Sequence, residues 1–291
     1  MNNILVTGSN GQLGNEMRKL GINSINRYLF TDINELDITN LHAIRSFVKE
    51  NNVSVIVNCA AYTAVDKAED NKETANLINH LAVSHLATIC KEFDATLIHI
   101  STDYVFQGDK STPYNEKEVT NPIGIYGKTK LEGEKAISAA GCKSLIFRTS
   151  WLYSEFGNNF FKTMLKLTSE KDRLSVVFDQ IGTPTYAGDL ANLIFMIIEE
   201  NKYSSNEGIY HYSNEGVCSW YDFAWEIGYL ADNTKCIIEP CYSSQFPSKV
   251  KRPNFSVLDK SKVKSTFNVN IPYWKQSLSI CLNNISNNKN E

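Results

Sequence analysis

Three evenly spaced glycines near the start of the chain constrain its fold more than any other feature. Gly8, Gly11 and Gly14 follow a short apolar stretch at 3–7 and precede a helical pattern that reaches about Leu20. In dinucleotide-binding units the first glycine allows a tight turn, the second lets the backbone approach a pyrophosphate, and the third lets helix pack on strand. The following helix would direct its free N–H groups at the phosphates. The pattern therefore predicts a Rossmann-type nucleotide-binding unit.

Apolar stretches and helical patterns alternate beyond this unit. Further strands are expected at 27–31, 53–57, 95–100 and 144–147. After the segment 64–70, a long amphipathic helix is expected to reach about Phe93. Alternation of this kind is typical of a parallel, doubly wound sheet with helices on both faces. We expect an α/β protein.

The second half of the chain has a different character and is expected to form a smaller α/β substrate-binding lobe. We assign 1–150, with 185–210 returning, to a Rossmann domain, and 151–184 with 211–291 to the lobe. After Gly208 the lobe is rich in tyrosine and tryptophan. The polar tail from Asn283 is expected to be frayed.

Composition excludes several classes of protein. Of the 291 residues, 42% are hydrophobic and 21% charged, and the net charge of −3 comes without a basic patch, so a nucleic-acid partner is not expected. No apolar run approaches the roughly 20 residues that span a bilayer. The seven cysteines form no Cys-x-x-Cys pair, which indicates neither a disulfide framework nor a zinc site. We expect a cytoplasmic enzyme without a leader segment or membrane association.

The stretch from Ser101 to Lys130 carries the chemistry. Thr102 and Asp103 follow the apolar strand at 95–100, and the carboxyl ends of such strands face the ligand crevice. Tyr126 and Lys130 are four residues apart in a helical pattern and share one face. A nearby ammonium is expected to lower the phenol pKa from its usual value of about 10. With the Thr102 hydroxyl, this trio suits proton transfer to a ketone oxygen, although a Tyr-x-x-x-Lys pair alone is common by chance.

Other positions fit a dinucleotide. Asp32 ends the second strand, where an acidic residue binds the adenosine ribose, which favours NADH without excluding NADPH; the alternative is an ordinary turn residue. Asp37 and Ile38 would lie beneath the adenine. Small residues after the third strand, at Ala60, Ala61, Tyr62 and Thr63, would allow close approach of a flat ligand. His99, inside the fourth strand, is interpreted as a packed core residue.

The chain as a whole resembles the extended short-chain dehydrogenases/reductases, and among them the dTDP-4-dehydrorhamnose reductases. The stretches that carry the resemblance are TGSNGQLG (7–14), VNCAAYTAVDKAE (57–69), HISTDYVF (99–106), NPIGIYGKTKLEGEKA (121–136), FRTSWLY (147–153), GNNFFKTM (157–164), DQIGTPTYAGDLA (179–191) and KRP (251–253). They span nearly the whole chain in the order of that family. In this family a threonine at the position of Thr102 replaces the serine usual among short-chain reductases.

The resemblance implies reduction of the 4-keto group of dTDP-4-dehydro-β-L-rhamnose by NADH or NADPH. Catalytic positions would be Thr102, Tyr126 and Lys130. The cofactor shell would include Gly11, Gln12, Leu13, Asp32, Asp37, Ile38, Ala61, Tyr62 and Thr63. Substrate contacts would be Thr102, Asp103 and Trp151, whose alternative role is core packing. Apart from the resemblance, the charges of Lys251 and Arg252 suit the substrate diphosphate, and the alternative is a solvated basic patch on the surface.

A magnesium ion and a homodimer are implied by the resemblance alone. Glu16, on the first helix, matches one acidic position near the metal in that family. A glutamate in the first turn of a helix also interacts favourably with the helix dipole, which needs no metal.

Two rival functions remain open from the sequence. An epimerase or dehydratase of the extended short-chain type would share the Rossmann half, although Asp103-Tyr104 does not supply the acidic pair of a dehydratase. A non-catalytic regulatory subunit of the methionine adenosyltransferase type also resembles this family.

Overall fold

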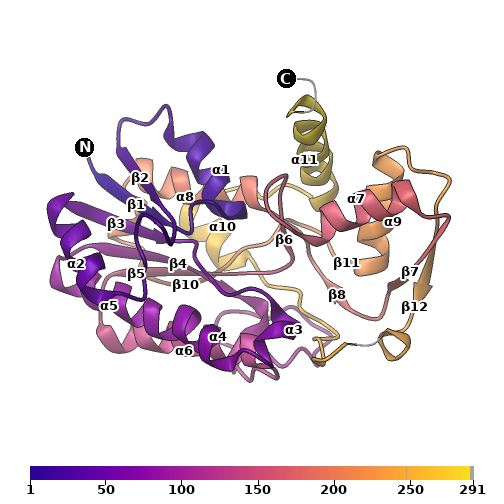
Figure 1. Ribbon diagram of the computed structural model, residues 1–291, viewed down its shortest axis with the longest axis horizontal. Helices are drawn as coiled ribbons and strands as arrows, with labels where there is room; N and C mark the ends of the chain where they lie inside the picture. The colour runs from indigo at the N-terminus through magenta and orange to yellow at the C-terminus, as the bar shows by residue number, and fades with distance from the viewer. Residues whose placement is uncertain (247, 289–291) are drawn as a thin grey trace.

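The computed structural model describes residues 1–246 and 248–288, and a central parallel sheet organises the larger part of the molecule (Figure 1). The sheet has the order β10-β5-β4-β3-β1-β2. Its strands are β1 (Asn3–Thr7), β2 (Arg27–Thr31), β3 (Val53–Asn58), β4 (Thr96–Thr102), β5 (Ser144–Thr149) and β10 (Gly208–His211). Strand order reverses between β1 and β3, which opens a crevice beyond their carboxyl ends. The predicted doubly wound α/β fold is confirmed.

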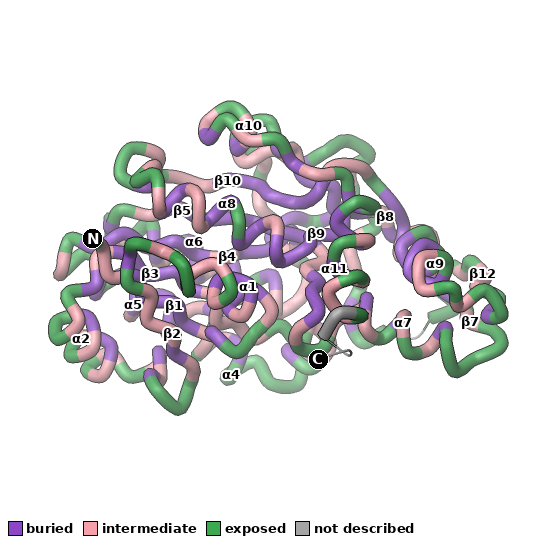
Figure 2. Tube along the Cα trace, turned by 90° about the horizontal axis from the view of Figure 1, so that it is seen from above, coloured by how far each residue is buried: buried purple, intermediate pink, exposed green. Residues whose placement is uncertain are grey.

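Helices cover both faces of this sheet. On one face lie α1 (Gln12–Gly21), α8 (Ala187–Glu199) and α10 (Ser261–Phe267), which share a core cluster with β1, β3 and β5. On the other lie α2 (Leu41–Glu50), α5 (Ala82–Glu92) and α6 (Ile125–Ala140). The central strands are therefore buried on both sides, as the near-continuous apolar runs of their sequences require. Figure 2 shows this as a buried trace along the strands with exposed positions on the outer helices.

A smaller α/β lobe lies beside the carboxyl ends of the strands (Figure 1). It contains α7 (Phe160–Glu170) and α9 (Trp220–Leu230), with the short strand pairs β7 (Arg173–Val177) and β12 (Ile237–Cys241), β8 (Ile181–Gly182) and β11 (Cys218–Ser219), and β6 (Leu152–Tyr153) and β9 (Thr185–Tyr186). The long C-terminal helix α11 (Trp274–Asn288) packs against it. Short 3-10 turns occur at η2 (Asp103–Val105), η3 (Lys202–Ser204) and η4 (Ser243–Gln245).

The boundaries drawn between the two parts stay a prediction. Within 211–291, which was assigned to the lobe, Val263, Phe267 and Ile271 pack into the core beneath the sheet. We propose that the chain divides into the two predicted parts, but that residues 263–271 belong to the Rossmann domain and not to the lobe.

The long helix expected between 64–70 and Phe93 is not one regular α-helix. The segment forms α3 (Val65–Ala68), α4 (Lys72–Asn76), a π-helical turn η1 (Leu77–Leu81) and then α5, which ends at Glu92. Glu69 lies in the first interruption, and its carboxylate accepts a hydrogen bond of 2.7 Å from the Ile125 N–H at the start of α6. The break thus supplies a cap for the helix that carries Tyr126.

Other boundaries differ in smaller ways. Strands β4 and β5 continue to Thr102 and Thr149, which pair with each other, so Thr102 is the last residue of its strand and does not follow it. The tail expected to be frayed from Asn283 is helical to Asn288, because Asn284 donates hydrogen bonds to Glu155 and Tyr186. Residues 289–291 lie outside the described residues.

Candidate active site

The glycine turn shapes the nucleotide end of the site. Gly8 has φ +62°, and a Cβ at this position would lie 2.6 Å from the Ala60 backbone. A Cβ on Gly14 would lie 2.5 Å from Ser9 Cα. Both positions therefore require glycine. No side chain caps α1 at Gly11, so the first N–H groups of the helix stay available to an anionic ligand.

A cavity of about 590 Å³ lies between this turn, the ends of β3 and β4, the start of α6 and the lobe. It brings together many of the residues predicted from sequence: Gly11, Gln12, Leu13, Ala61, Thr63, Thr102, Asp103, Tyr126, Lys130, Trp151 and Arg252. Segments distant in the sequence thus meet around one space large enough for a nicotinamide and a sugar ring.

The other predicted cofactor residues lie outside this lining. Asp32 accepts hydrogen bonds from the N–H groups of Asn10 and Ile33, at 3.0 and 2.8 Å. Asp37 accepts from the Thr39 N–H at 2.9 Å, as in an ordinary turn, and Ile38 belongs to a core cluster. Their contacts with an adenosine stay a prediction.

Two asparagine side chains hold the loop that follows β3 and carries Ala60 and Tyr62, and Asn58 Oδ1 accepts from the Ala60 N–H at 3.2 Å. The side chain of Asn79, in the π-helical turn, accepts from the Tyr62 N–H at 2.9 Å and donates to the Tyr62 carbonyl at 3.0 Å. Sequence reasoning missed Asn79, because a regular helix through this segment gives no reason to single it out. Its position follows from the π turn.

Thr102 and Asp103 form the floor of the cavity. The Thr102 hydroxyl donates to Asp103 Oδ1 at 3.0 Å and accepts from the Tyr104 N–H at 3.2 Å. Asp103 is buried, and burial raises its pKa to about 7, although hydrogen bonds oppose this effect. This carboxyl can therefore hold a proton near neutral pH.

The expected lowering of the Tyr126 pKa is wrong for this geometry. Burial raises the Tyr126 pKa to about 12, and a hydrogen bond with Thr102 only partly opposes it. The reason is where the ammonium lies: Lys130 Nζ donates to the Ile100 carbonyl at 2.6 Å and lies 3.3 Å from His99 Nε2, along β4. Burial also lowers the Lys130 pKa to about 8, although the Glu134 charge raises it. The phenol is thus held protonated.

Aromatic side chains form the wall on the side of the lobe. Trp151 adopts the left-handed backbone conformation, with φ +49°, which is uncommon for a bulky residue and marks a constrained position. Its ring stacks on Trp220 with centroids 3.6 Å apart, and Phe160 lies 4.5 Å from Trp220. Sequence reasoning counted Trp220 only among the aromatics of the lobe. The Ser219-x-x-Asp222 capping box could have predicted that a helix, α9, begins at Trp220.

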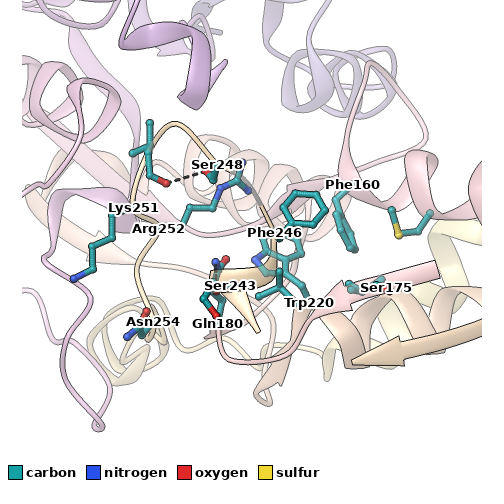
Figure 3. A pocket seen from close by; sticks show the side chains of 15 residues that line it. Phe160, Ser175, Gln180, Trp220, Ser243, Phe246, Ser248, Lys251, Arg252 and Asn254 are labelled. Atoms are coloured by element: carbon teal, nitrogen blue, oxygen red, sulfur yellow. Dashed lines mark hydrogen bonds between the residues drawn. The ribbon is translucent and has the colours of Figure 1, made fainter. Parts of the chain in front are cut away.

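A second cavity of about 450 Å³ continues the first and shares Phe160, Trp220 and Arg252 with it. Figure 3 shows the aromatic rings gathered on one side and Lys251 and Arg252 on the other, with polar side chains between them. The polar lining includes Ser175, Gln180, Ser243, Ser248 and Asn254. Arg252 Nη2 donates to Asp66 Oδ2 at 2.9 Å. Together the cavities form an extended groove with an aromatic wall and two cations.

Glu16 lies away from both cavities in a buried ionic cluster. The Lys19 ammonium lies 3.1 Å from Glu16 and 2.6 Å from Glu155, and burial raises the Glu16 pKa to about 7. Across the described residues, no three His, Cys, Asp or Glu side chains are grouped so as to hold a metal ion. The structure gives no support to the predicted role of Glu16.

Comparison with known proteins identifies the family. A family model described as the RmlD substrate binding domain matches residues 1–287. The dTDP-4-dehydrorhamnose reductase of Aggregatibacter actinomycetemcomitans is 40% identical over 287 residues, covering 96% of this chain and 97% of that protein. The chain belongs to the dTDP-4-dehydrorhamnose reductase family.

Solved structures of the family agree. A dTDP-4-dehydrorhamnose reductase from Clostridium acetobutylicum superposes with a TM-score of 0.93 at 42% identity, covering 98% of this chain and 99% of that one. The one from Bacillus anthracis, in complex with NADP, gives a TM-score of 0.92 at 36% identity, with coverage of 98% and 100%. A UDP-glucose 4-epimerase from Thermus thermophilus shares the fold at 14% identity.

No helix in the described part of the chain is long and apolar enough to cross a membrane.

Proposed function

We propose that this protein reduces the 4-keto group of dTDP-4-dehydro-β-L-rhamnose to give dTDP-L-rhamnose, using a nicotinamide dinucleotide. The observation that carries the proposal is that Thr102, Tyr126 and Lys130 line a single cavity with the glycine turn, in a member of the reductase family. When bound, the reduced nicotinamide supplies the hydride. Every other part of the reaction depends on groups of this chain.

The glycine turn suits the cofactor. Gly8 and Gly14 permit a backbone approach that a Cβ would block, and the uncapped start of α1 offers N–H donors to a pyrophosphate. Gln12, Leu13 and Ala61 line the adjoining cavity, where the nicotinamide end would lie. These residues fit a dinucleotide.

Tyr126 would act as the proton donor to the C4 oxygen. Its pKa of about 12 keeps the phenol protonated at neutral pH, which is the form a reduction needs. The Thr102 hydroxyl, at the end of β4, has one proton, which it would turn from Asp103 to donate to the same oxygen from a fixed strand position. Lys130 would supply positive charge beneath the reacting group. These roles stay proposals for each residue.

The second cavity would hold the nucleotide. The aromatic wall of Phe160, Trp220 and Phe246 suits a flat base, and Lys251 and Arg252 suit a diphosphate. Trp151 and Asp103, in the first cavity, would contact the sugar. The two adjoining cavities would thus hold the sugar at one end of the substrate and the base at the other.

Cofactor choice is a finer proposal. Asp32, beside the Asn10 N–H, would accept hydrogen bonds from the ribose of NADH. Arg18 lies on the other side of Asn10, where Nη2 donates to Ser9 Oγ at 2.9 Å and to Asn10 Oδ1 at 3.3 Å. A cation so close to the turn would offset part of the repulsion between Asp32 and a 2′-phosphate. We therefore propose that both NADH and NADPH are used.

The decisive experiment follows nicotinamide absorbance with purified protein and dTDP-4-dehydrorhamnose. We expect substrate-dependent oxidation of NADH and of NADPH, and formation of dTDP-L-rhamnose. Absence of oxidation above background with both cofactors would exclude the reductase activity. A homodimer and a magnesium ion rest on the family resemblance alone, and sedimentation with and without chelator tests both.

A further inference from the structure

A buried histidine lies directly behind Lys130. His99, on β4, is fully buried, with Nε2 3.3 Å from Lys130 Nζ and Nδ1 3.1 Å from Asn58 Nδ2. Its sequence position suggested a core residue that only packs. Its two ring nitrogens instead join a predicted catalytic side chain to the end of β3.

The orientation of the Asn58 amide is set by its other neighbours. Asn58 Oδ1 accepts from the Ala60 N–H at 3.2 Å and from the Thr7 hydroxyl at 2.7 Å. A backbone N–H can only donate, so the amide atom that faces it must be the oxygen. Asn58 Nδ2 therefore faces His99 and donates to Nδ1.

This donation determines the tautomer of the ring. Burial, and then the Lys130 charge, hold the His99 pKa well below its usual range, so the ring is neutral. A neutral imidazole has one donor and one acceptor. With Nδ1 accepting from Asn58, the proton lies on Nε2 and points at Lys130 Nζ.

The His99 Nε2–H group cannot hydrogen-bond to a Lys130 ammonium, because both are donors, but it can donate to a neutral Lys130 amine. A lysine ammonium has three donors and no acceptor, whereas the neutral amine can accept from Nε2–H. The other tautomer would favour the ammonium, but it requires Asn58 to turn its amide and place an NH₂ group against the Ala60 N–H. The protonation of Lys130 is therefore linked to Asn58, and through it to Thr7 and Ala60, which lie on either side of Gly8.

We propose that His99 is a positioning residue that, held as the Nε2–H tautomer by Asn58, makes the Lys130 ammonium more acidic. The mechanistic benefit rests on the proposed reduction. After Tyr126 has given up its proton, a more acidic ammonium is a better donor for re-forming the phenol. Lys130 then becomes an amine, which accepts the hydrogen bond that His99 offers.

Other charged and titratable groups also lie around Lys130, and some of them raise its pKa. Glu134 and the Ile100 carbonyl favour the ammonium, but the Glu134 carboxylate is already paired with Arg148 at 2.6 Å. The remaining titratable groups that line the same cavity are Cys59, Asp103, Tyr104, Tyr126, Tyr153 and Arg252. His99 is the neighbour within hydrogen-bonding distance whose contact changes sign with its tautomer.

The first test needs no substrate. In ¹⁵N-histidine-labelled protein, the ring nitrogens of the five histidines can be observed by long-range ¹H–¹⁵N NMR, and the His99→Gln spectrum identifies the His99 signals. We expect a protonated Nε2 and an unprotonated Nδ1 for His99 at pH 7. An Nδ1–H tautomer would overturn the proposal, whatever reaction the protein catalyses.

The second test is the pH profile of kcat/KM. His99→Gln places an amide near the Nε2 position, where it can turn its oxygen to the ammonium. The alkaline limb should then move up by about one pH unit, the effect of one hydrogen bond to a charged group. His99→Asn, whose amide lies near Nδ1, removes the opposing Nε2–H without offering an acceptor to Lys130, so it should move the limb up by less than His99→Gln does. An unmoved or lowered limb in His99→Gln would overturn the proposal.

A matched control separates this effect from loss of a buried ring. His211 is equally buried, and its Nδ1 contacts the Tyr114 carbonyl at 2.9 Å, not Lys130. His211→Gln should lower stability without moving the limb, and a shift equal to that of His99→Gln would contradict a specific role for His99. If wild type shows no turnover, the proposed function fails while the NMR result still decides the tautomer.

Discussion

The Arg148 guanidinium donates two hydrogen bonds to the Glu134 carboxylate, at 2.9 and 2.6 Å, and both side chains are buried. Ser101 also donates to Glu134. This pair ties α6, which carries Tyr126 and Lys130, to β5 and β4. It fixes the proposed catalytic helix against the sheet.

Removing one partner of this pair should be costly. Arg148→Met would leave the Glu134 charge buried without compensation, so we expect the free energy of unfolding to fall by about 3–5 kcal/mol in urea titrations. Arg45→Met breaks an exposed pair with Glu92 at 2.9 Å and should cost about 1 kcal/mol or less. Equal losses in the two variants would show that burial does not set the strength of the pair.

Tyr126→Phe should lower kcat with little change in fold. The proton donor is lost while the ring and its edge-on contact with Tyr104 remain, so we expect a decrease of about 10²–10⁴-fold with an unchanged circular dichroism spectrum. Tyr28→Phe removes the hydroxyl of a half-buried tyrosine that contacts Glu199 on the outer face, and should leave kcat unchanged. Near-normal turnover in Tyr126→Phe would assign proton donation to another group.

Asp103 should make stability depend on pH. Its folded pKa, about 7, lies above the model-peptide value near 4, so the native state holds the proton more tightly than the unfolded chain. This contribution to stability is complete below pH 4 and is lost as pH rises through 7. In urea titrations, the free energy of unfolding of Asp103→Asn should therefore rise relative to that of wild type between pH 4 and 7.5, by a few kcal/mol at most. A constant difference, as expected for the exposed control Asp232→Asn, would mean that Asp103 is charged throughout.

Trp220→Leu should weaken nucleotide-sugar binding. The stack on Trp151 is lost from the wall shared by the two cavities, so we expect KM for the sugar substrate to rise about tenfold while cofactor affinity stays the same. Trp225→Leu, on the same helix but 47% exposed, is the matched control and should leave KM unchanged. Loss of cofactor binding in Trp220→Leu would show that this aromatic wall binds the cofactor and not the nucleotide-sugar.

Asp32→Ala should shift cofactor preference toward NADPH. Wild type should use NADH at least as well as NADPH, judged by kcat/KM, and removing the carboxylate removes its repulsion of a 2′-phosphate. That repulsion is roughly 4 kcal/mol at 4 Å and an effective dielectric of 20, before any cation offsets it. Arg18→Met should shift the ratio the other way. A wild-type preference for NADPH of tenfold or more would show that Asp32 does not face the ribose.

The glycine turn and the parallel sheet could be predicted because both follow from local patterns. Gly8 and Gly14 occupy positions where a Cβ has no room, and the strands are apolar because both of their faces are covered. The trio of Thr102, Tyr126 and Lys130 could be predicted for the same reason, since helix and strand spacing place them near one another.

What could not be predicted depends on contacts between distant segments. A long lysine side chain on a helix has many rotamers, and nothing local tells that Lys130 lies along β4 toward Ile100 and His99. The π turn at Leu77–Leu81 has ordinary helix-forming residues, and Asn79 is the one that serves Tyr62. Trp220 meets Trp151 only because the lobe folds back on itself.

The wall that the two cavities share limits how the specificity of this protein can be changed. Phe160, Trp220 and Arg252 line both cavities. With the base and the reacting sugar placed as proposed, a substitution at any of the three would change the surroundings of both. Gln180 and Ser243 line only the second cavity, so substitutions there leave the first cavity unchanged. Variants that accept another nucleobase without losing turnover should therefore arise at these positions first. Variants that accept another sugar should arise around Thr63 and Asn158, which line only the first cavity.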